Sequence, residues 1–300
     1  MYVLETKALT KKFSDFTAVD NLNLKITKGS IYGFLGSNGS GKSTTIRMLC
    51  GVLTPTSGSI EIFGKSLTKN LPFLKSKIGY MSQKFSLHPD LTVMENLNFY
   101  AGLYSLPKDI IEQRIREIIN LAQVESFKNE LTSALAGGWR QRLALGCAIL
   151  HKPDILFLDE PTSGVDPNSR RMFWDIIHSL IEMGTTILIT THFMDEAEHC
   201  DNITFIHQGI TIASGSPKEL KNLIPYKLWQ ISVPEPLSLQ EKLRTENYPE
   251  IYVRGKQLRI LSSPEKIPTF IDNFPVNEIT PSLEDVFVYL IKQERKKNND

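Results

Sequence analysis

The fold of this chain is decided by the stretch Gly36-Ser37-Asn38-Gly39-Ser40-Gly41-Lys42-Ser43-Thr44. It follows the apolar run 31–35, which predicts a strand, and leads into residues 44–50, which we predict to be helical. The glycines let the backbone curl into a nest of N–H groups for an anion, and the helix adds the positive end of its dipole. Lys42 is expected to reach the β- and γ-phosphates, and the Ser43 hydroxyl to ligate Mg²⁺. This loop predicts a binding site for a nucleoside triphosphate.

Residues 154–160 form an apolar run that ends in two carboxylates, Asp159 and Glu160. Consecutive large apolar residues indicate a strand buried on both faces, as in a parallel sheet. Ligands of such sheets bind at the carboxyl ends of the strands, so we expect both carboxylates beside the phosphate loop. Asp159 would hold Mg²⁺, directly or through water, and Glu160 would accept a proton from an attacking water. The alternative is a solvated strand end, and the phosphate loop in the same chain argues against it.

Length and charge limit the class of protein. The 300 residues permit one large or two moderate domains. Lys+Arg 34 against Asp+Glu 33 gives a net charge of +1, so no whole-chain electrostatic argument favours a nucleic-acid partner. No apolar run approaches the length that crosses a bilayer, and the chain does not start with a secretory signal. We therefore expect a cytoplasmic protein whose membrane role, if any, comes through a partner. The cysteines, which share no metal-like spacing, are expected as reduced core or near-core thiols: Cys50, Cys147 and Cys200.

The order of periodic segments predicts an α/β fold for roughly the first 220 residues. Residues 2–28 alternate as antiparallel strands do, whereas the apolar spacing between 92 and 150 is helical. Buried strands at 155–158 and 186–190 are separated by a helix expected at 168–182. This pattern indicates a parallel core sheet, an antiparallel β subdomain and a helical subdomain at about 84–150.

Residues 221–300 have a different character and predict a separate accessory domain with no catalytic constellation. The expected order is β-α-β-β-α-β, which matches a small α+β, ferredoxin-like unit. Its elements are a strand at 227–233, a helix at 237–244, strands at 250–253 and 257–261, a helix at 264–271, a strand at 276–279 and a last helix from Ser282. Arg254-Gly255-Lys256 supplies a tight turn for the central hairpin. Ser282 and Asp285 have the spacing of a capping box.

The stretch Leu135-Ala136-Gly137-Gly138-Trp139-Arg140-Gln141-Arg142, followed by Asp159-Glu160-Pro161-Thr162, resembles the ATP-binding-cassette (ABC) ATPases. The ordered motifs cover roughly the first 215 residues, and the chain looks closest to the nucleotide-binding subunits of bacterial efflux systems related to antibiotic-resistance exporters. Residues 280–287 are similar to a domain that many of those subunits carry. The resemblance implies a P-loop NTPase fold, ATP and Mg²⁺ as cofactors, ATP hydrolysis, a second cassette, membrane-spanning permease subunits, and a location at the inner face of the membrane.

The resemblance also assigns roles to individual residues. Phe13 matches the aromatic that stacks on adenine, the alternative being a core residue at a strand end. Gln83 matches the glutamine that contacts Mg²⁺ and the attacking water and senses the transport partner. Asp166 matches the loop that crosses between paired subunits, and His192 matches the histidine that contacts the γ-phosphate. The other histidines are expected at the surface or in packing: His88, His151, His178, His199 and His207.

Ala136 is a departure from the family pattern, which usually has serine at this position. That hydroxyl would donate to the γ-phosphate of the nucleotide bound by the opposite subunit, and a hydrogen bond to a charged group contributes about 1.5–3 kcal/mol. Gly137, Gly138 and the following helix still offer backbone N–H groups. We expect a weakened site that still functions.

Three functions fit these patterns to different degrees. A transport motor, in which ATP closes two cassettes and hydrolysis reopens them, fits best. A soluble ABC ATPase acting on ribosomes or DNA is the alternative, but such relatives usually carry two cassettes in one chain or long coiled coils, and neither feature is present. A non-catalytic nucleotide sensor is disfavoured by the intact Glu160 and His192. The sequence does not identify the transported substrate.

Overall fold

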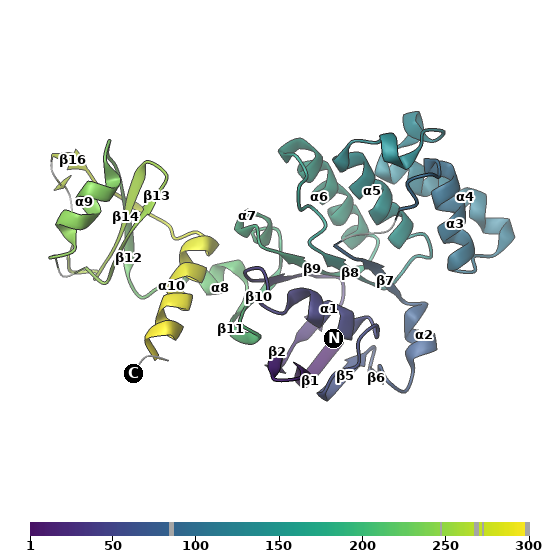
Figure 1. The fold of residues 1–300 in the computed structure, drawn as a ribbon, viewed down its shortest axis with the longest axis horizontal. Coiled ribbons are helices and arrows are strands. Elements are labelled where there is room, and N and C mark those ends of the chain that lie inside the picture. Colours follow the sequence, from purple (N-terminus) through teal and green to yellow (C-terminus); the bar gives the residue numbers. More distant parts are fainter. Residues whose placement is uncertain (84–86, 247, 267–269, 272, 298–300) are drawn as a thin grey trace. The chain divides into compact units, whose positions relative to one another are not determined.

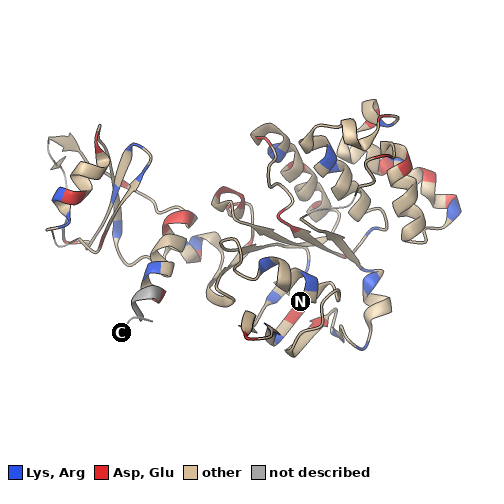
Figure 2. Cartoon of the chain, viewed as in Figure 1, with Lys and Arg blue, Asp and Glu red and all other residues tan. Residues whose placement is uncertain are grey.

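The computed structural model describes residues 1–83, 87–246, 248–266, 270–271 and 273–297. The chain divides into two compact units, Met1–Ser216 and Pro217–Asp300, which we call the first and the second unit. Helix α8 (Pro217–Lys221) therefore belongs to the second unit, whereas the sequence-based boundary placed nearly all of it in the first. Figure 2 shows Lys and Arg interspersed with Asp and Glu along the elements. None of the helices in the described ranges has the length and hydrophobicity that a bilayer crossing requires.

A parallel sheet forms the centre of the first unit (Figure 1), and its strand order is β11-β10-β4-β9-β8-β7. All neighbouring strands from β10 to β7 run parallel, and β11 pairs antiparallel with β10. Every residue of β4, β8 and β9 is buried, because layers cover both faces of the sheet. The predicted parallel core is thus confirmed. The strand bounds are β4 (Ile31–Leu35), β7 (Ile78–Met81), β8 (Ile155–Asp159), β9 (Thr186–Thr191), β10 (Asn202–His207) and β11 (Ile210–Gly215).

One face of this sheet packs on α1 (Lys42–Leu49) and on an antiparallel sheet of order β2-β1-β5-β6, with β3 paired to β1. Alternate residues of the parallel strands, among them Phe34, Phe157 and Leu188, join the hydrophobic core shared with this layer. The prediction of antiparallel strands near the start of the chain is confirmed. These strands are β1 (Tyr2–Phe13), β2 (Phe16–Leu22), β3 (Lys25–Thr27), β5 (Ser57–Ile62) and β6 (Lys65–Ser66).

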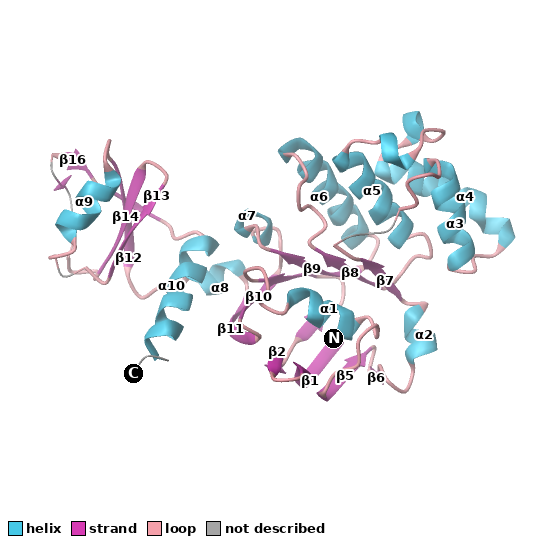
Figure 3. Cartoon of the chain, viewed as in Figure 1, coloured by secondary structure: helices cyan, strands magenta, loops and turns pink. Residues whose placement is uncertain are grey.

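Helices cover the opposite face of the parallel sheet (Figure 3). The helical spacing predicted between 92 and 150 is confirmed by α3, α4 and α5, and residues 84–86 of the predicted helical subdomain lie outside the described ranges. Thr92 starts α3 with a capping box to Glu95, and Ile115 and Ile118 bury the amphipathic face of α4 against its neighbours. The helices of the first unit beyond α1 are α2 (Leu71–Lys75), α3 (Val93–Leu103), α4 (Lys108–Ala122), α5 (Gly137–Ala148), α6 (Pro167–Glu182) and α7 (Met194–Ala197), with 3₁₀ turns at Glu125–Phe127 and Thr132–Ala134.

The second unit contains an antiparallel sheet of order β13-β14-β12-β17. The predicted turn is confirmed, since Arg254 pairs with Gln257 across the β13–β14 hairpin. The predicted capping box is also confirmed, because the Asp285 N–H donates to Ser282 Oγ at 3.3 Å and the Ser282 N–H to Asp285 Oδ2 at 2.8 Å. The elements are β12 (Lys227–Ser232), α9 (Pro236–Leu243), β13 (Glu250–Arg254), β14 (Gln257–Ser262), β15 (Phe270–Ile271), β16 (Phe274–Pro275), β17 (Asn277–Ile279) and α10 (Leu283–Lys297).

The helix predicted at 264–271 is wrong where the structure describes it. Phe270 and Ile271 form strand β15, which pairs with β16, and residues 267–269 lie outside the described ranges. The apolar spacing suggested a helix, but Pro268 would remove a backbone donor from its interior, which costs about 3 kcal/mol.

Candidate functional site

The phosphate loop joins β4 to α1, and its last glycine is the N-cap of that helix. Gly41 has φ +107, and a Cβ placed on it would lie 2.4 Å from the Ala18 carbonyl oxygen. Both facts require glycine at this position. No side chain caps α1, so the N–H groups of its first turn remain oriented toward the loop. This is the arrangement that binds phosphate at a helix N-terminus.

Lys42 lies inside this loop with 4% of its surface exposed. Its ammonium donates to the carbonyl oxygens of Gly36 at 2.9 Å and Ser37 at 3.1 Å, and lies 3.0 Å from Glu160 Oε1. A buried cation requires such compensation, because desolvating an unpaired charge is costly. Phosphate binding would require the ammonium to exchange these partners for phosphate oxygens.

Asp159 ends β8 beside the loop, as predicted, with 3% of its surface exposed. Its Oδ1 accepts hydrogen bonds from Ser43 Oγ at 3.0 Å and from Thr190 Oγ1 at 2.8 Å. Burial raises the pKa of Asp159, although these two hydrogen bonds act in the opposite direction. Sequence reasoning missed Thr190. Its signal is a hydroxyl at the carboxyl end of a neighbouring buried strand, where the register pairs it with Asp159.

Glu160 is the residue on which the predicted catalytic side chains converge. Its Oε2 lies 3.3 Å from Gln83 Nε2 and 3.2 Å from His192 Nδ1, while Oε1 faces Lys42. Its backbone is left-handed, with φ +48, and its N–H donates to Thr190 Oγ1 at 2.9 Å and the Thr190 carbonyl oxygen at 3.1 Å. Residues far apart in the sequence are therefore gathered around one buried carboxylate.

Ala136, Gly137, Gly138 and Asp166 form a second group, at the N-termini of α5 and α6. Ala136 is the N-cap of α5 and is exposed, with no side-chain capping bond. Gly138 is buried where the two helices approach, and a Cβ on it would lie 2.2 Å from Ser169 Oγ. Asp166 caps α6 by accepting from the N–H groups of Asn168 and Ser169, and its hydrogen bonds with Ser169 lower its pKa.

Phe13 ends β1 with 45% of its surface exposed, and Lys11 Nζ lies 5.1 Å from its ring centroid. The alternative role as a core residue is therefore wrong. Elsewhere, the expectation of core thiols is confirmed, because all three cysteines are free and buried. Among the remaining histidines, His178 and His199 are exposed, while the others are half-buried: His88, His151 and His207.

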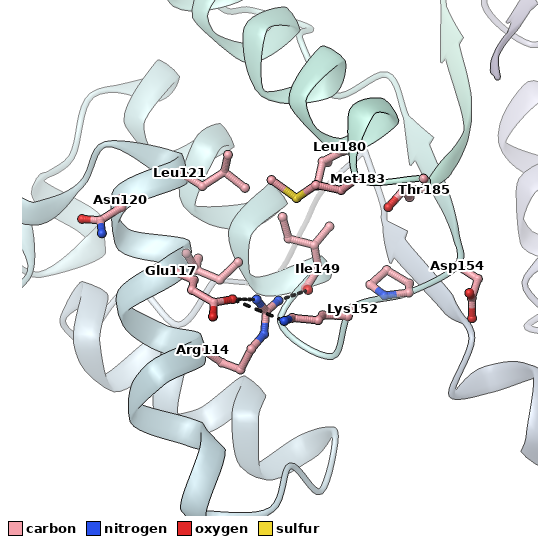
Figure 4. A pocket seen from close by; sticks show the side chains of 13 residues that line it. Arg114, Glu117, Asn120, Leu121, Ile149, Lys152, Asp154, Leu180, Met183 and Thr185 are labelled. Atoms are coloured by element: carbon pink, nitrogen blue, oxygen red, sulfur yellow. Dashed lines mark hydrogen bonds and ion pairs between the residues drawn. The ribbon is translucent and has the colours of Figure 1, made fainter. Parts of the chain in front are cut away.

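A hollow of about 750 Å³ opens at the other end of the same strands, where Asp154 precedes β8 (Figure 4). It lies between α4, the α5–β8 loop and the end of α6. Arg114 and Lys152 both contact Glu117, and Asp154 pairs with Lys77 at 2.9 Å. Because each of these cations already has a carboxylate partner, the hollow is unsuited to a triphosphate. Its apolar floor consists of Ile118, Leu121, Ile149 and Leu180.

The loop, the paired carboxylates and the sheet order define a P-loop nucleotide-binding cassette, and comparison with known proteins agrees. The ABC transporter family profile matches residues 19–163. Over 219 residues the chain is 49% identical to the probable multidrug ABC transporter ATP-binding protein YbhF of Escherichia coli, covering 73% of this chain and 38% of that protein. It is 39% identical to the Nod factor export ATP-binding protein I of Cupriavidus metallidurans, covering 73% of this chain and 72% of that protein.

Solved structures show the same architecture. The cbiO1 subunit from Clostridium perfringens, described as part of an ABC transporter complex, is 31% identical with a TM-score of 0.66, covering 73% of this chain and 90% of that one. A dimeric ATP-binding cassette bound to ADP and Pi is 27% identical with a TM-score of 0.65, covering 71% and 98%. The chain therefore belongs to the ATP-binding subunits of the ABC transporter family, and its first unit carries the ABC ATPase cassette.

Proposed function

We propose that this chain is the ATP-hydrolysing motor subunit of an export-type ABC transporter. One observation carries the proposal: the Glu160 carboxylate is held between Lys42, Gln83 and His192. It lies beside the buried Asp159 and the N-terminus of α1. A carboxylate placed next to a phosphate-binding loop can take the proton of a water that attacks the γ-phosphate, and general-base catalysis contributes about 10²–10⁴ in rate.

The residues around the loop divide the remaining work. Lys42 and the N–H groups of α1 would neutralise the phosphates, His192 would contact the γ-phosphate, and Phe13 would stack on adenine. The remaining loop residues would surround the phosphates through their backbone: Gly36, Ser37, Asn38, Gly39, Ser40, Gly41 and Thr44. Each role is inferred from the position of the residue in the cassette, and substitution of that residue tests it.

Ser43, Asp159 and Gln83 are the residues that would hold Mg²⁺. They offer hard oxygen ligands, and Ser43 and Asp159 already contact one another at 3.0 Å. The described residues contain no cluster of three His, Cys, Asp or Glu side chains, so the ion would share its coordination with phosphate oxygens. A bound Mg²⁺ would supply positive charge that offsets the charge of the phosphates. The buried Asp159, whose pKa is raised by burial, is a carboxylate that gains from a neighbouring cation.

A second cassette and a membrane permease are the proposed partners, and no nucleic acid is required. Ala136, Gly137, Gly138 and Asp166 form one group at the N-termini of α5 and α6, and its proposed role is at the nucleotide of an opposing subunit. The dimeric relative bound to ADP and Pi supports such a pair. The export proteins among the relatives support a separate permease and a place at the inner face of the membrane. Because the chain matches only 38% of YbhF, its substrates and partners remain part of this proposal.

The second unit is proposed to be a ferredoxin-like accessory domain that does not take part in hydrolysis. Its all-antiparallel order β13-β14-β12-β17 supports this, because a β-α-β-β-α-β chain pairs its third strand with both its first and its second. The segment before β17 departs from the pattern, since Phe270–Ile271 and Phe274–Pro275 form the paired strands β15 and β16.

Glu160→Gln tests the motor. Transport complexes isolated from membranes should bind MgATP normally but turn it over at least about 10²-fold more slowly, because the base is lost while the geometry is kept. Glu182→Gln, on the exposed end of α6, is the matched control and should behave as the wild type. Near-normal turnover in Glu160→Gln would overturn the assignment. Recovery of the chain with ribosomes, and without a membrane protein, would favour the soluble alternative.

A further inference from the structure

Glu196, on α7, has a buried carboxylate that plays no part in the proposed mechanism. It is 2% exposed, and it accepts a hydrogen bond of 2.5 Å from Thr162 Oγ1, which is itself 1% exposed. Arg170 Nε lies 3.4 Å from the same carboxylate oxygen. A buried carboxylate is unfavourable unless its charge is compensated, so Glu196 constrains the segments that carry Thr162 and Arg170. Three chain segments meet here: the loop after Glu160, the start of α6, and the segment after His192.

On one side, the contact between Arg170 and Glu196 is connected to His192 through Phe193. The Arg170 guanidinium lies 4.1 Å from the centroid of the Phe193 ring, and that ring lies 4.2 Å from the His192 ring. His192 Nδ1 in turn lies 3.2 Å from Glu160 Oε2. The position of the imidazole against the catalytic carboxylate therefore depends on where Arg170 and Glu196 hold the segment that carries it.

On the other side, the contact between Arg170 and Glu196 is connected to the N-terminus of α5 through the first turn of α6. The Arg170 N–H donates to the Asp166 carbonyl oxygen at 2.9 Å in the first turn of α6. In the same turn, Ser169 packs so closely on Gly138 that a Cβ there would lie 2.2 Å from its Oγ. Arg170 thus belongs to the turn that contacts the α5 N-terminus and also holds the His192 segment.

The contact between Arg170 and Glu196 is only partly made. Arg170 Nε and Glu196 Oε2 are both buried, and neither has a hydrogen-bond partner in the described part of the chain. A donor and an acceptor that are left without partners in the same contact can satisfy one another after a small shift of either segment, and a buried polar group without a hydrogen bond is unfavourable. This complementarity indicates a second arrangement in which the guanidinium and the carboxylate form a full pair.

We propose that Glu196 and Arg170 are positioning residues that couple the His192 imidazole to the N-termini of α5 and α6. The pair tightens as the His192 segment moves toward the γ-phosphate, so that hydrolysis is favoured when the α5 N-terminus is engaged. Neither residue touches the nucleotide. The inference rests on the proposed ATPase function. It adds a route that connects the residues around Glu160 with those at the N-termini of α5 and α6.

The test measures ATP turnover and MgATP affinity in Glu196→Gln, Arg170→Gln and the double variant. Because a misplacement of about 1 Å can cost up to about 10²-fold in rate, each single variant should lower kcat about tenfold, with KM for ATP within about twofold of the wild type. The double variant should be no slower than the slower single, since both changes remove one coupling. Asp195→Asn is the matched control: it removes a carboxylate 3.6 Å from the same arginine, but one that is 74% exposed, and kcat should not change.

Thermal unfolding separates positioning from a merely structural role. A structural role would lower the unfolding temperature and leave kcat per folded molecule unchanged, and this result would overturn the proposal. A rise in KM in step with the loss of kcat would also overturn it. The same holds for a double variant whose fold-loss in kcat is the product of the fold-losses of the two single variants. If Glu196→Gln does not fold, Thr162→Val against Thr162→Ser gives the same comparison, because only serine keeps the hydroxyl bond to Glu196. Normal turnover in Glu196→Gln overturns only the proposed coupling. A wild-type transport complex without ATPase activity overturns both the coupling and the proposed function.

Discussion

At the scale of single residues, the buried pair of Lys42 and Glu160 affects both the stability of the protein and its proposed function. Their charged atoms lie 3.0 Å apart and their side chains are 4% and 8% exposed. In such surroundings, removal of one partner leaves an uncompensated charge, whereas neutralising both is much less costly. The same two side chains would separate on nucleotide binding, because Lys42 turns to the phosphates and Glu160 to the attacking water. Stability and function are therefore coupled at this pair.

Lys42→Ala should destabilise the nucleotide-free protein by about 3 kcal/mol, because Glu160 is left buried without its cation. It should also lose most MgATP affinity, since the positive charge facing the triphosphate is gone. Denaturant unfolding and nucleotide titration measure the two effects. Adding Glu160→Gln to Lys42→Ala should restore part of the stability and none of the affinity. Unchanged MgATP binding in Lys42→Ala would show that the site is misassigned.

Asp159→Asn should stabilise the nucleotide-free protein at neutral pH while weakening MgATP binding. Burial raises the pKa of Asp159 above the unfolded value of about 3.9, so between the two values the native state binds more protons than the unfolded state. The free energy of unfolding contributed by this group then falls as pH rises through that window, and the cost is fully present above the folded-state pKa. Thermal unfolding as a function of pH should show the advantage of the variant shrinking as pH falls toward about 4. A variant less stable than the wild type at neutral pH contradicts this account.

At the scale of elements, the N-termini of three helices belong to the two groups of site residues. Gly41 opens α1 without a side-chain cap, Asp166 caps α6 through its carboxylate, and Ala136 leaves α5 uncapped. Ala136 has the extended conformation of an N-cap, with φ −63 and ψ 156. A serine there could therefore act twice, as an acceptor for the α5 N–H groups and as a donor to a phosphate.

Ala136→Ser should produce two separable effects. Capping should stabilise the nucleotide-free protein by about 0.5–2 kcal/mol, which thermal unfolding without ATP detects. Donation to the γ-phosphate should tighten ATP-driven dimerisation and raise ATPase activity by no more than about tenfold, the worth of one hydrogen bond of modest net strength. Dimerisation is best read in the Glu160→Gln background, where turnover does not reopen the pair. Added stability without any change in dimerisation would mean that position 136 faces the helix and not the nucleotide.

At the scale of the whole molecule, the first and second units have hydrophobic cores of their own. Ile46, Phe157 and Leu188 belong to a core in the first unit, whereas Trp229, Ile231 and Ile260 belong to one in the second. Separate cores allow separate folding, and the nucleotide contacts of the proposed site all come from the first unit.

A chain ending at Ser216 should fold cooperatively and bind MgATP with an affinity within about threefold of the full chain, because no site residue lies beyond that point. Circular dichroism establishes folding, and equilibrium titration gives the affinity. Lys42→Ala in the same short chain is the control for specific binding. A well-folded short chain that no longer binds nucleotide would show that the second unit contributes to the site.

The amino-acid sequence by itself determined the phosphate loop, the buried strands and the Asp159-Glu160 pair. These features depend on local chemistry: glycines that allow a tight loop, apolar runs that suit a doubly covered sheet, and a strand end that places carboxylates beside a ligand. Local pattern failed at 264–271, where apolar spacing indicated a helix, whereas Phe270 and Ile271 form strand β15.

Only the tertiary structure decided which side chains meet. Thr190 reaches Asp159 because β8 and β9 are neighbours in one register, and Lys42 reaches Glu160 across the same strand ends. The contact between Arg170 and Glu196 likewise depends on how α6 and α7 pack. Each of these contacts joins segments far apart in the chain. Strand order, register and helix packing set their distances, and these follow from burying the whole apolar surface together and not from any local pattern.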